Sequence, residues 1–353
     1  MDFSNVLIKW YRQHKRDLPW RNITDPYKIW LSEIILQQTR VDQGMPYYLR
    51  FIDHYPTVND LAKAHEEEVL KLWQGLGYYS RARNLHTTAK YIANELNGVF
   101  PNTYEDLLKL KGIGEYTAAA IASFSYQLPY PVIDGNVYRV LSRIFNVVTP
   151  IDTGTGKKQF KELAATLIDK SNPGEYNQAI MEFGALYCKP QSPNCEHCVF
   201  NIHCMAHAKN KANELPVKSK KLKQKDRYFN YLVFSDQAHT YIKQRNEKDI
   251  WKGLFDFPLI ETPQKINSIF ELNTQHYELL LNQHLNIHRS EEKIHLLSHQ
   301  KIHAVFWWVE LKSLPIPLRK ELKIKWKEIH NYAVPKLMEN YIHEKVKMST
   351  FEI

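Results

Sequence analysis

The sequence predicts a mainly α protein with two domains, in which a helical first domain is followed by a smaller α+β domain. From residue 1 to about 208, apolar residues recur every three or four positions. The stretch 209–227 has almost no apolar content, and aromatic and β-branched runs follow it. A chain of 353 residues is long enough for two domains.

The helical pattern of the first domain is clearest in two runs. DPYKIWLSEIILQQTRV at 25–41 and EEEVLKLWQGL at 66–76 both place apolar residues at helical spacing. The pair Asn97-Gly98 and several prolines separate such runs. We therefore expect a series of short helices over residues 1–208.

TYEDLLKLKGIGEYTAAAIASF at 103–124 predicts a helix, a tight turn and a second helix. Thr103 with Asp106 resembles a capping box at the first helix start. Gly112 and Gly114 allow positive φ and a close approach of a ligand. Together with Lys111, the amides that open the second helix form a candidate phosphate clamp on DNA. The alternative is an ordinary helical hairpin without a bound ligand, because G-x-G alone is weak evidence for phosphate binding.

The segment 209–227 is predicted to be a linker, and residues 228–350 the second domain. The linker carries eight basic residues against Glu214 and Asp226, so it is a solvated tether or a phosphate-contacting segment. Strands are expected in YFNYLVFS, TYIKQRN and AVFWWVELK. YELLLNQHL at 277–285 is a possible helix between them.

The net charge of +9 favours a polyanionic partner, most often nucleic acid, and on charge alone a merely basic soluble protein is an equal alternative. The N-terminus lacks the apolar core of a signal peptide, and no run approaches 18 apolar residues. We expect no membrane association and a cytoplasmic location, at the nucleoid if the source is bacterial.

All four cysteines fall within 188–204, with the spacing C-x6-C-x2-C-x5-C. Four thiolates in so short a loop suit one tetrahedral site, which is either zinc or a [4Fe–4S] cluster. Only one C-x2-C pair is present, so the spacing favours iron–sulfur. The ligands would be Cys188, Cys195, Cys198 and Cys204.

Two carboxylates are candidates for acid–base chemistry. Glu33 lies among Trp30, Ile34 and Leu36, so burial should raise its pKa and suit it to a general acid; otherwise it lies at the edge of an apolar face. Asp134 precedes an apolar-periodic helix, where it is an N-cap. The helix dipole and amides should also keep it ionised, as a developing cation requires.

The hairpin and the cysteine spacing resemble those of the helix–hairpin–helix DNA glycosylases of the endonuclease III superfamily. In its bifunctional members a lysine near the start of the second hairpin helix attacks the sugar. Tyr116 stands there in this chain, and a tyrosine forms no Schiff base. The resemblance therefore implies a monofunctional glycosylase with a [4Fe–4S] cluster, unless Tyr116 is only a packing residue.

SEIILQQTRV, GLGYYSRARNL, GIGEYTAAAIASF and DGNVYRVLSR together resemble the A/G-specific adenine DNA glycosylases of the MutY type. The resemblance implies that Glu33 protonates adenine and Asp134 stabilises the oxocarbenium ion. Tyr116 and Asn136 complete the site, in a cleft between two helical lobes. Residues expected in the adenine pocket are Arg21 and Gln178.

A flipped base must be replaced in the stack, and the resemblance assigns this role to residues of two loops. These are Gln38, Leu76, Gly77 and Tyr78, with Arg81 as a phosphate contact. For Tyr78 the alternative is a place in the core.

The chain after the linker resembles the Nudix-like C-terminal domain of adenine glycosylases, which senses 8-oxoguanine. It lacks the Nudix catalytic box. Ser298 and His299 match a recognition loop that is often Phe-Ser-His, and Leu297 departs from that pattern; His299 is otherwise an ordinary loop histidine.

The sequence thus predicts a monomeric DNA glycosylase of base excision repair that flips and removes adenine opposite 8-oxoguanine or guanine in double-stranded DNA. Two rivals stay open. One is a thymine or pyrimidine glycosylase of the same superfamily, against which Glu33, Tyr116 and the second domain argue. The other is a non-catalytic, cluster-bearing DNA-binding protein, against which only the paired carboxylates with Tyr116 speak.

Overall fold

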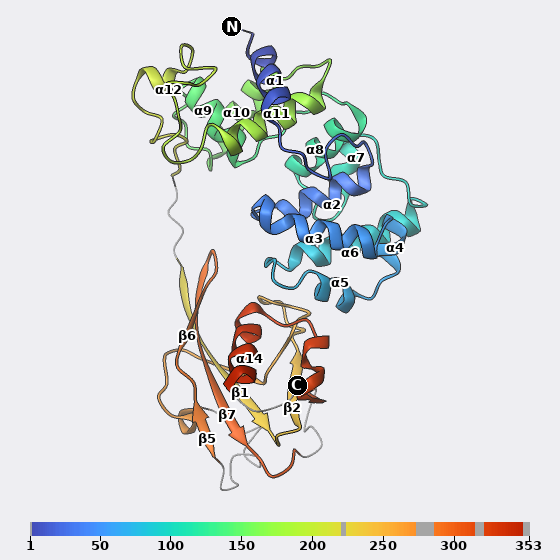
Figure 1. Ribbon diagram of the computed structural model, residues 1–353, viewed down its shortest axis with the longest axis vertical. Helices are drawn as coiled ribbons and strands as arrows, with labels where there is room; N and C mark the ends of the chain where they lie inside the picture. Colours follow the sequence, from blue (N-terminus) through green and yellow to red (C-terminus); the bar gives the residue numbers. More distant parts are fainter. Residues whose placement is uncertain (1, 220–223, 273–285, 315–320, 349–353) are drawn as a thin grey trace. The chain divides into compact units, whose positions relative to one another are not determined.

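The computed structural model describes residues 2–219, 224–272, 286–314 and 321–348 (Figure 1). The chain divides into two compact units, Met1–Lys63 with Asn84–Lys221 and Ala64–Arg83 with Leu222–Ile353. The first is helical and the second is built on a mixed sheet, which confirms the predicted fold class. The boundary near residue 221 falls inside the predicted linker. No helix among the described residues is long and apolar enough to cross a membrane.

The first unit consists of short helices joined by turns. They are α1 (Phe3–His14), α2 (Pro26–Leu36), α3 (Val41–His54), α4 (Val58–Lys63), most of α6 (Ser80–Glu95), α7 (Tyr104–Lys109), α8 (Glu115–Tyr126), α9 (Gly135–Ile144), α10 (Gly154–Leu167), α11 (Pro173–Leu186) and α12 (Met205–Ala208).

Several of these helices begin where a side chain caps the free amides of the first turn. Asp25 accepts from Tyr27 N at the start of α2, and Pro26 occupies the first turn, where it loses no hydrogen bond. Thr103 accepts from Asp106 N at the start of α7, which is the N-cap half of the expected capping box; the Asp106 carboxylate accepts from the Thr103 hydroxyl instead of the Thr103 backbone N–H. Asp134 and Thr153 cap α9 and α10 in the same way.

The predicted helix–turn–helix is present as α7 and α8. Gly112 has a φ of 80°, and a Cβ on it would lie 2.7 Å from the Asn84 Cβ, so only glycine fits the turn. Gly114 differs from the expectation: it is the N-cap of α8 with a φ of −95°, and needs no positive φ. Leu107 and Leu110 are buried, but Leu108 is exposed and does not share their apolar face.

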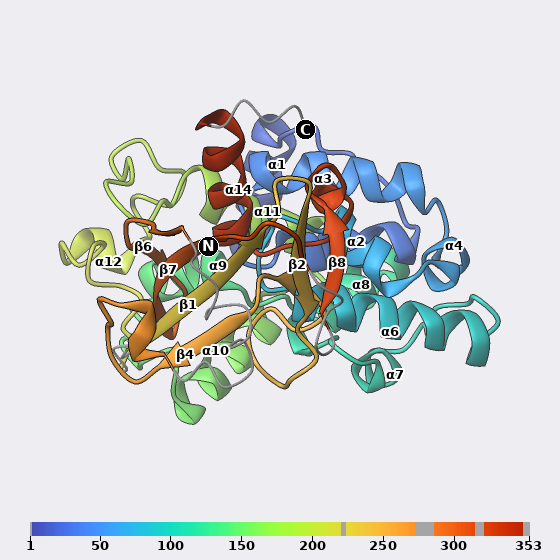
Figure 2. The ribbon, with the colours of Figure 1, turned by 90° about the horizontal axis from the view of Figure 1, so that it is seen from below.

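The second unit is a mixed sheet (Figure 2). Its central pair is parallel: β1 (Lys225–Ser235) runs beside β7 (Gln300–Glu310) along its full length, from Lys225 opposite Gln300. All other pairings are antiparallel. The remaining strands are β2 (His239–Gln244), β3 (Phe255–Asp256), β4 (Leu259–Thr262), β5 (Ile287–Arg289), β6 (Lys293–Leu296) and β8 (Leu322–Lys325). The strands expected from sequence correspond to β1, β2 and β7.

Both faces of this sheet are covered, which explains why β1 and β7 are nearly continuous apolar runs. Tyr231 and Phe306 belong to one core cluster, which α14 (Lys336–Met348) helps to form. Leu232 and Trp307 belong to a second cluster on the opposite face. Two short 3₁₀ helices, η1 (Ile269–Glu271) and η2 (Trp326–Asn331), also contribute. The possible helix at 277–285 lies outside the described residues.

Residues 64–83, which include α5 (Glu66–Leu72), pack with the second unit rather than the first. Lys71 Nζ donates to the Tyr332 carbonyl at 3.1 Å. The Arg83 guanidinium donates to the Lys252 carbonyl at 2.5 Å. The segment that the sequence assigns to the helical domain is therefore bound to the α+β unit through backbone acceptors.

Candidate active site and cysteine pocket

Glu33 lies on α2 with its side chain directed at α8. It is only 6% exposed, and its Oε2 accepts a hydrogen bond from the Tyr116 hydroxyl at 2.5 Å. Tyr116 is the second residue of α8, immediately after the hairpin turn. The helix–turn–helix therefore delivers a phenol to a buried carboxyl, which the two sequence motifs alone do not reveal.

The environment of Glu33 makes it a carboxyl that holds its proton near neutral pH. Burial raises its pKa to about 7, and the negative charge of Asp134 adds to this rise. The hydrogen bond from Tyr116 and the positive charge of Arg21 act in the opposite direction. The predicted elevation of the Glu33 pKa is thus confirmed. A carboxyl with a pKa in this range can donate a proton at neutral pH.

This pKa has a consequence for folding stability. A carboxyl whose pKa is raised in the folded state stabilises the fold only at low pH, and the contribution is lost as pH rises through about 7. Between pH 5.5 and 8.5 the unfolding free energy of the wild type should therefore fall by about 2 kcal/mol relative to Glu33→Gln. Urea unfolding at both pH values measures this, with Glu115→Gln, an exposed carboxylate on α8, as the background. If the difference in unfolding free energy between the wild type and Glu33→Gln is the same at both pH values, the pKa of Glu33 is not elevated.

Asp134 caps α9, and both oxygens of its carboxylate accept hydrogen bonds. Its Oδ1 accepts from Val137 N at 2.8 Å as the N-cap of α9, and its Oδ2 accepts from Asn136 Nδ2 at 2.8 Å. Burial raises its pKa above 3.8, and these two donors oppose the rise. The expectation that the helix terminus dominates is thus incomplete, because desolvation is the larger effect.

Asn136 is in turn held by Arg139, a buried residue that sequence reasoning did not select. Arg139 Nη2 donates to Asn136 Oδ1 at 2.8 Å, and its Nε donates to the Cys188 carbonyl at 2.7 Å. A Cβ on Gly184 would lie 2.6 Å from the Asn136 Cβ, so the glycine lets α11 approach α9. The carboxylate at 134 is therefore connected by hydrogen bonds to the start of the cysteine loop.

Arg21 and Gln178 meet in one polar cluster, as their shared assignment predicts. Gln178 Oε1 accepts from the Tyr11 hydroxyl at 2.7 Å, and the Arg21 guanidinium lies over the Tyr11 ring at 5.4 Å. Arg21 also forms an ion pair with Glu182 at 2.6 Å.

Glu182 is a site residue that sequence reasoning missed. It is fully enclosed and binds both Arg16 and Arg21. Burial acts to raise its pKa, but the hydrogen bonds from the two arginines outweigh burial and hold it at about 2. The signal was available: Glu182 follows Gln178 by one helical turn and is a lone carboxylate in an apolar stretch, as Glu33 is.

The residues assigned to the DNA surface differ in exposure. In the first unit, Gln38, which follows α2, and Lys111, Gly112 and Gly114 of the hairpin are exposed. In the second unit, Tyr78 is 49% exposed, whereas Leu76 is only 6% exposed and belongs to the core.

Arg81 does not extend into solvent. Its guanidinium donates to the Gly77 carbonyl at 3.2 Å and lies over the rings of Trp73 and Tyr78. Burial lowers its pKa to about 10. In this conformation Arg81 supports the loop that presents Tyr78.

Ser298 and His299 lie in the turn between β6 and β7. The Ser298 hydroxyl is hydrogen-bonded to the Tyr78 hydroxyl, so two residues chosen from separate motifs meet within the second unit. His299 is exposed. Leu297, which replaces the usual phenylalanine, packs against the core cluster of the sheet.

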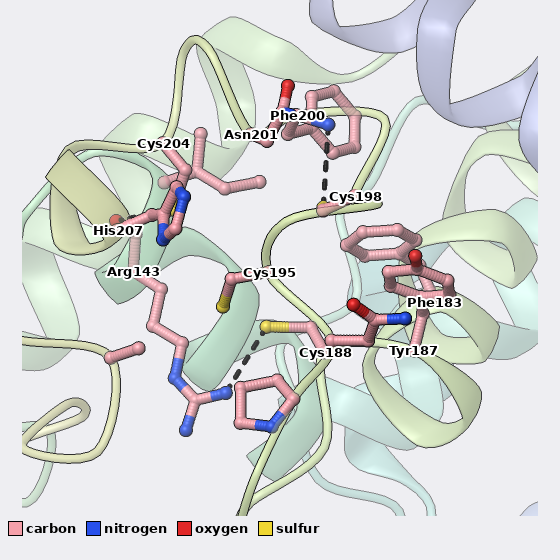
Figure 3. Close-up of a pocket in the computed structure, with 14 residues that line it drawn as sticks. Arg143, Phe183, Tyr187, Cys188, Cys195, Cys198, Phe200, Asn201, Cys204 and His207 are labelled. Atoms are coloured by element: carbon pink, nitrogen blue, oxygen red, sulfur yellow. Dashed lines mark hydrogen bonds between the residues drawn. The ribbon is translucent and has the colours of Figure 1, made fainter. Parts of the chain in front are cut away.

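The four cysteines line a single pocket (Figure 3). Arg143 donates to Cys188 Sγ at 3.4 Å, and Phe200 N donates to Cys198 Sγ at 3.4 Å. Burial raises the pKa of Cys198 to about 12, so a thiolate in this pocket would need a cation to stabilise it. Among the described residues, no group of three or more His, Cys, Asp or Glu side chains meets the geometry of a metal-ion site.

Comparisons with known proteins agree with this organisation. Residues 31–166 match the model of the HhH-GPD superfamily of base excision DNA repair proteins, and residues 230–344 match a NUDIX domain. The adenine DNA glycosylase of Buchnera aphidicola subsp. Schizaphis graminum is 33% identical over 348 residues, which cover 96% of this chain and 97% of that protein.

Two solved structures share the fold of the helical part. A thermostable thymine-DNA glycosylase superposes with a TM-score of 0.55 at 29% identity, over 59% of this chain and 95% of that chain. A non-covalent endonuclease III–DNA complex gives a TM-score of 0.51 at 23% identity, over 59% of this chain and 94% of that chain.

Proposed function

The chain belongs to the adenine DNA glycosylase family, and from this premise we propose that it removes adenine mispaired with 8-oxoguanine or guanine. It is a DNA-binding glycosylase of base excision repair. The proposal adds the mispair, the flipping of adenine out of the duplex and the roles of individual residues. A repair enzyme of this kind would act where the chromosome is, in the cytoplasm or at the nucleoid, and a monomer suffices.

The observation that carries the proposal is the buried Glu33 with a pKa of about 7 beside Asp134. Purines leave readily only after the ring is protonated, so the neutral form of Glu33 would donate its proton to a ring nitrogen of the flipped adenine. The glycosidic bond then breaks with its electron pair going to the base. The ionised Asp134 would stabilise the cationic sugar until water adds to the anomeric carbon and releases a proton.

Tyr116 makes the enzyme monofunctional in this proposal. Its hydroxyl is engaged with Glu33, and burial together with the charge of Glu33 raises its pKa well above 10. It therefore remains a neutral hydrogen-bond donor and is no nucleophile at neutral pH. The product is an abasic site in an intact strand.

The adenine pocket would be formed by the Arg21, Gln178 and Glu182 cluster. The two arginines keep Glu182 ionised and occupy both of its oxygens, so Glu182 would hold Arg21 in position rather than contact the base.

The second domain would read the base opposite the adenine. Ser298 and His299 offer hydrogen-bond donors on one turn, and Tyr78, half exposed beside Ser298, offers a ring for stacking. Either hydroxyl can be the donor in the Tyr78–Ser298 bond, so Ser298 would accept from Tyr78 and donate its own proton to 8-oxoguanine.

We further propose that the cysteine pocket holds a [4Fe–4S] cluster. Four cysteines and a buried arginine that reaches Cys188 suit an anionic thiolate-ligated cluster. Its role would be to fix the 188–204 loop, which has little regular secondary structure of its own.

Cys198→Ser tests this cofactor. The purified wild type should be brown with about four iron atoms per chain, whereas the variant should lose most of the iron and become sensitive to proteolysis within 188–204. Iron and zinc analysis with limited proteolysis measures both effects. A colourless wild type with one zinc per chain would refute the iron–sulfur assignment.

The function itself is tested by single-turnover base release from an A:8-oxoguanine duplex, with and without alkali. Parallel duplexes contain A:G, T:G and an oxidised pyrimidine. We expect adenine release with strand cleavage only after alkali. Cleavage without alkali would indicate a lyase, release of thymine would support the pyrimidine alternative, and tight binding without release would indicate a non-catalytic protein.

A further inference from the structure

The turn that carries Ser298 is held from one side by the beginning of β1. Lys225 N donates to the His299 carbonyl at 3.0 Å, and Gln224 Nε2 donates to the Leu297 carbonyl at 3.0 Å. Leu297 N closes the turn onto the Gln300 carbonyl at 2.8 Å. These bonds fix the main chain of the turn. They do not fix the orientation of its side chains, which depends on other contacts.

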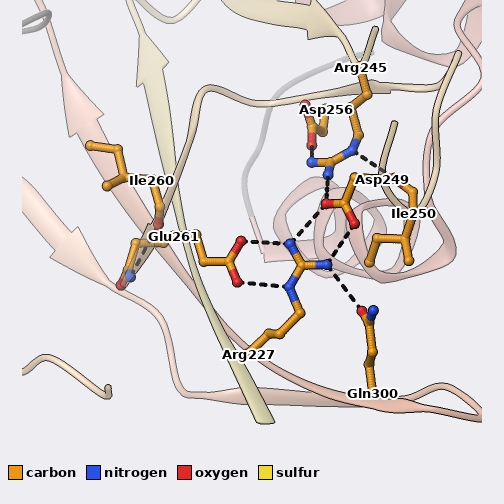
Figure 4. Close-up of polar contacts among 9 residues, drawn as sticks. Arg227, Arg245, Asp249, Ile250, Asp256, Ile260, Glu261 and Gln300 are labelled. Atoms are coloured by element: carbon orange, nitrogen blue, oxygen red, sulfur yellow. Dashed lines mark hydrogen bonds and ion pairs between the residues drawn. The ribbon is translucent and has the colours of Figure 1, made fainter. Parts of the chain in front are cut away.

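Arg227, two residues further along β1, supplies such a contact (Figure 4). Its Nη1 donates to Gln300 Oε1 at 3.1 Å. Its other four bonds go to carboxylates: two to Glu261 at 2.8 and 2.6 Å, and two to Asp249 at 2.8 and 2.8 Å. All five N–H donors of the guanidinium are therefore used, which leaves this side chain one possible orientation.

The two carboxylates are themselves anchored. Arg245 binds Asp249 at 3.0 Å and the buried Asp256 at 2.7 Å. Arg227 lies over the Phe229 ring at 4.8 Å, and Arg245 lies over the same ring at 5.9 Å. The Arg227 side chain is only 11% exposed, so solvent screens these pairs weakly.

We propose that Arg227 is a positioning residue for recognition of the base opposite adenine, acting through Gln300 on the Ser298–His299 turn. The inference rests on the proposed role of this turn. The side chains of this three-residue turn would otherwise sample several rotamers, and ordering them on binding would reduce the affinity for the base that they contact. Arg227 orders the turn beforehand by transmitting the rigidity of the carboxylate network to the first residue of β7.

The chemistry of the pair also explains why arginine is needed. Lysine has three donors around a single nitrogen and cannot reach two carboxylates and an amide in one plane. A substitution at Gln300 removes only the last bond and leaves Arg227 paired with Asp249 and Glu261. A substitution at Gln300 therefore tests the positioning role more specifically, because it keeps the ion pairs of Arg227 with Asp249 and Glu261.

The experiment compares Gln300→Leu, Gln300→Glu and Arg227→Lys with the wild type in the full chain. The readout is the ratio of base-release rate constants for A:8-oxoguanine and A:G duplexes, below saturating enzyme. Gln300→Leu and Arg227→Lys should lower this ratio about three- to tenfold, the range that corresponds to one typical hydrogen bond. Gln300→Glu retains an acceptor for Arg227 and should keep the ratio within about twofold. The thermal midpoint of each variant identifies any loss caused by unfolding.

Ser298→Ala separates the two levels of the proposal. If the wild type shows no preference for A:8-oxoguanine, the proposed reading of that base fails. If the wild type prefers it and Ser298→Ala loses the preference while Gln300→Leu keeps it in full, only the positioning role of Arg227 is overturned. Loss of the preference in Gln300→Glu as well as Gln300→Leu would also overturn it, because the acceptor would then be irrelevant.

Discussion

Glu33→Gln is expected to lower the single-turnover rate of adenine release by about 10²- to 10⁴-fold, the usual range for loss of a general acid. Glutamine has the same shape and still accepts from the Tyr116 hydroxyl, so the site should keep its structure. It has no proton to donate to the base. Duplex affinity should therefore stay within about twofold while base release is lost.

The pH dependence gives this prediction a second test. Because the active form of Glu33 is protonated and its pKa is about 7, the wild-type rate should be highest below pH 7 and fall tenfold for each pH unit well above it. The residual rate of Glu33→Gln should lack this dependence. Glu115→Gln, an exposed carboxylate on the helix of Tyr116, is the matched control and should behave as wild type.

Excision that survives Glu33→Gln with an unchanged pH profile would remove Glu33 from the chemistry. Glu182 would then be the next carboxylate to consider. Its pKa of about 2 makes it a poor acid at neutral pH, so such a result would require an environment that differs once DNA is bound.

Asp134→Asn should lower the rate of adenine release by about 10²- to 10³-fold, as for removal of one electrostatic group aimed at the transition state. Asparagine caps a helix about as well as aspartate, so the bond from Val137 N is kept. The bond from Asn136 Nδ2 is lost, because asparagine has no second acceptor oxygen, so the unfolding free energy should fall by about 1 kcal/mol. The loss of rate then reports the negative charge and not the cap.

Asp134→Ala provides the comparison, because it removes both functions. It should lose activity to a similar degree and lose about 1 kcal/mol more stability than Asp134→Asn, because the cap bond is lost as well. Chemical unfolding and single-turnover kinetics on the two variants measure both effects. If Asp134→Asn is as active as the wild type, Asp134 is an N-cap and nothing more, and the oxocarbenium role is wrong.

The helical hairpin, the caps and the strands could be read from the sequence because each depends on residues within a few positions of one another. Thr103 caps α7 through Asp106, and Asp134 caps α9 through Val137. The elevated pKa of Glu33 was also predictable, since apolar neighbours on both sides of it in α2 ensure that the helix buries it. These are local rules of period, cap and turn.

The partners of these groups were decided by tertiary structure alone. The contacts of three groups join residues from separate elements. Glu33 accepts from the phenol of Tyr116, Glu182 pairs with two arginines, and Arg227 makes five bonds. Nor does any local pattern show that residues 64–83 join the α+β unit. Glu33 and Glu182 are both buried carboxylates with apolar neighbours in their helices, yet one has a pKa of about 7 and the other about 2. A helical pattern reports that a side chain is buried, whereas its ionisation depends on which charges packing brings to it from elsewhere in the chain.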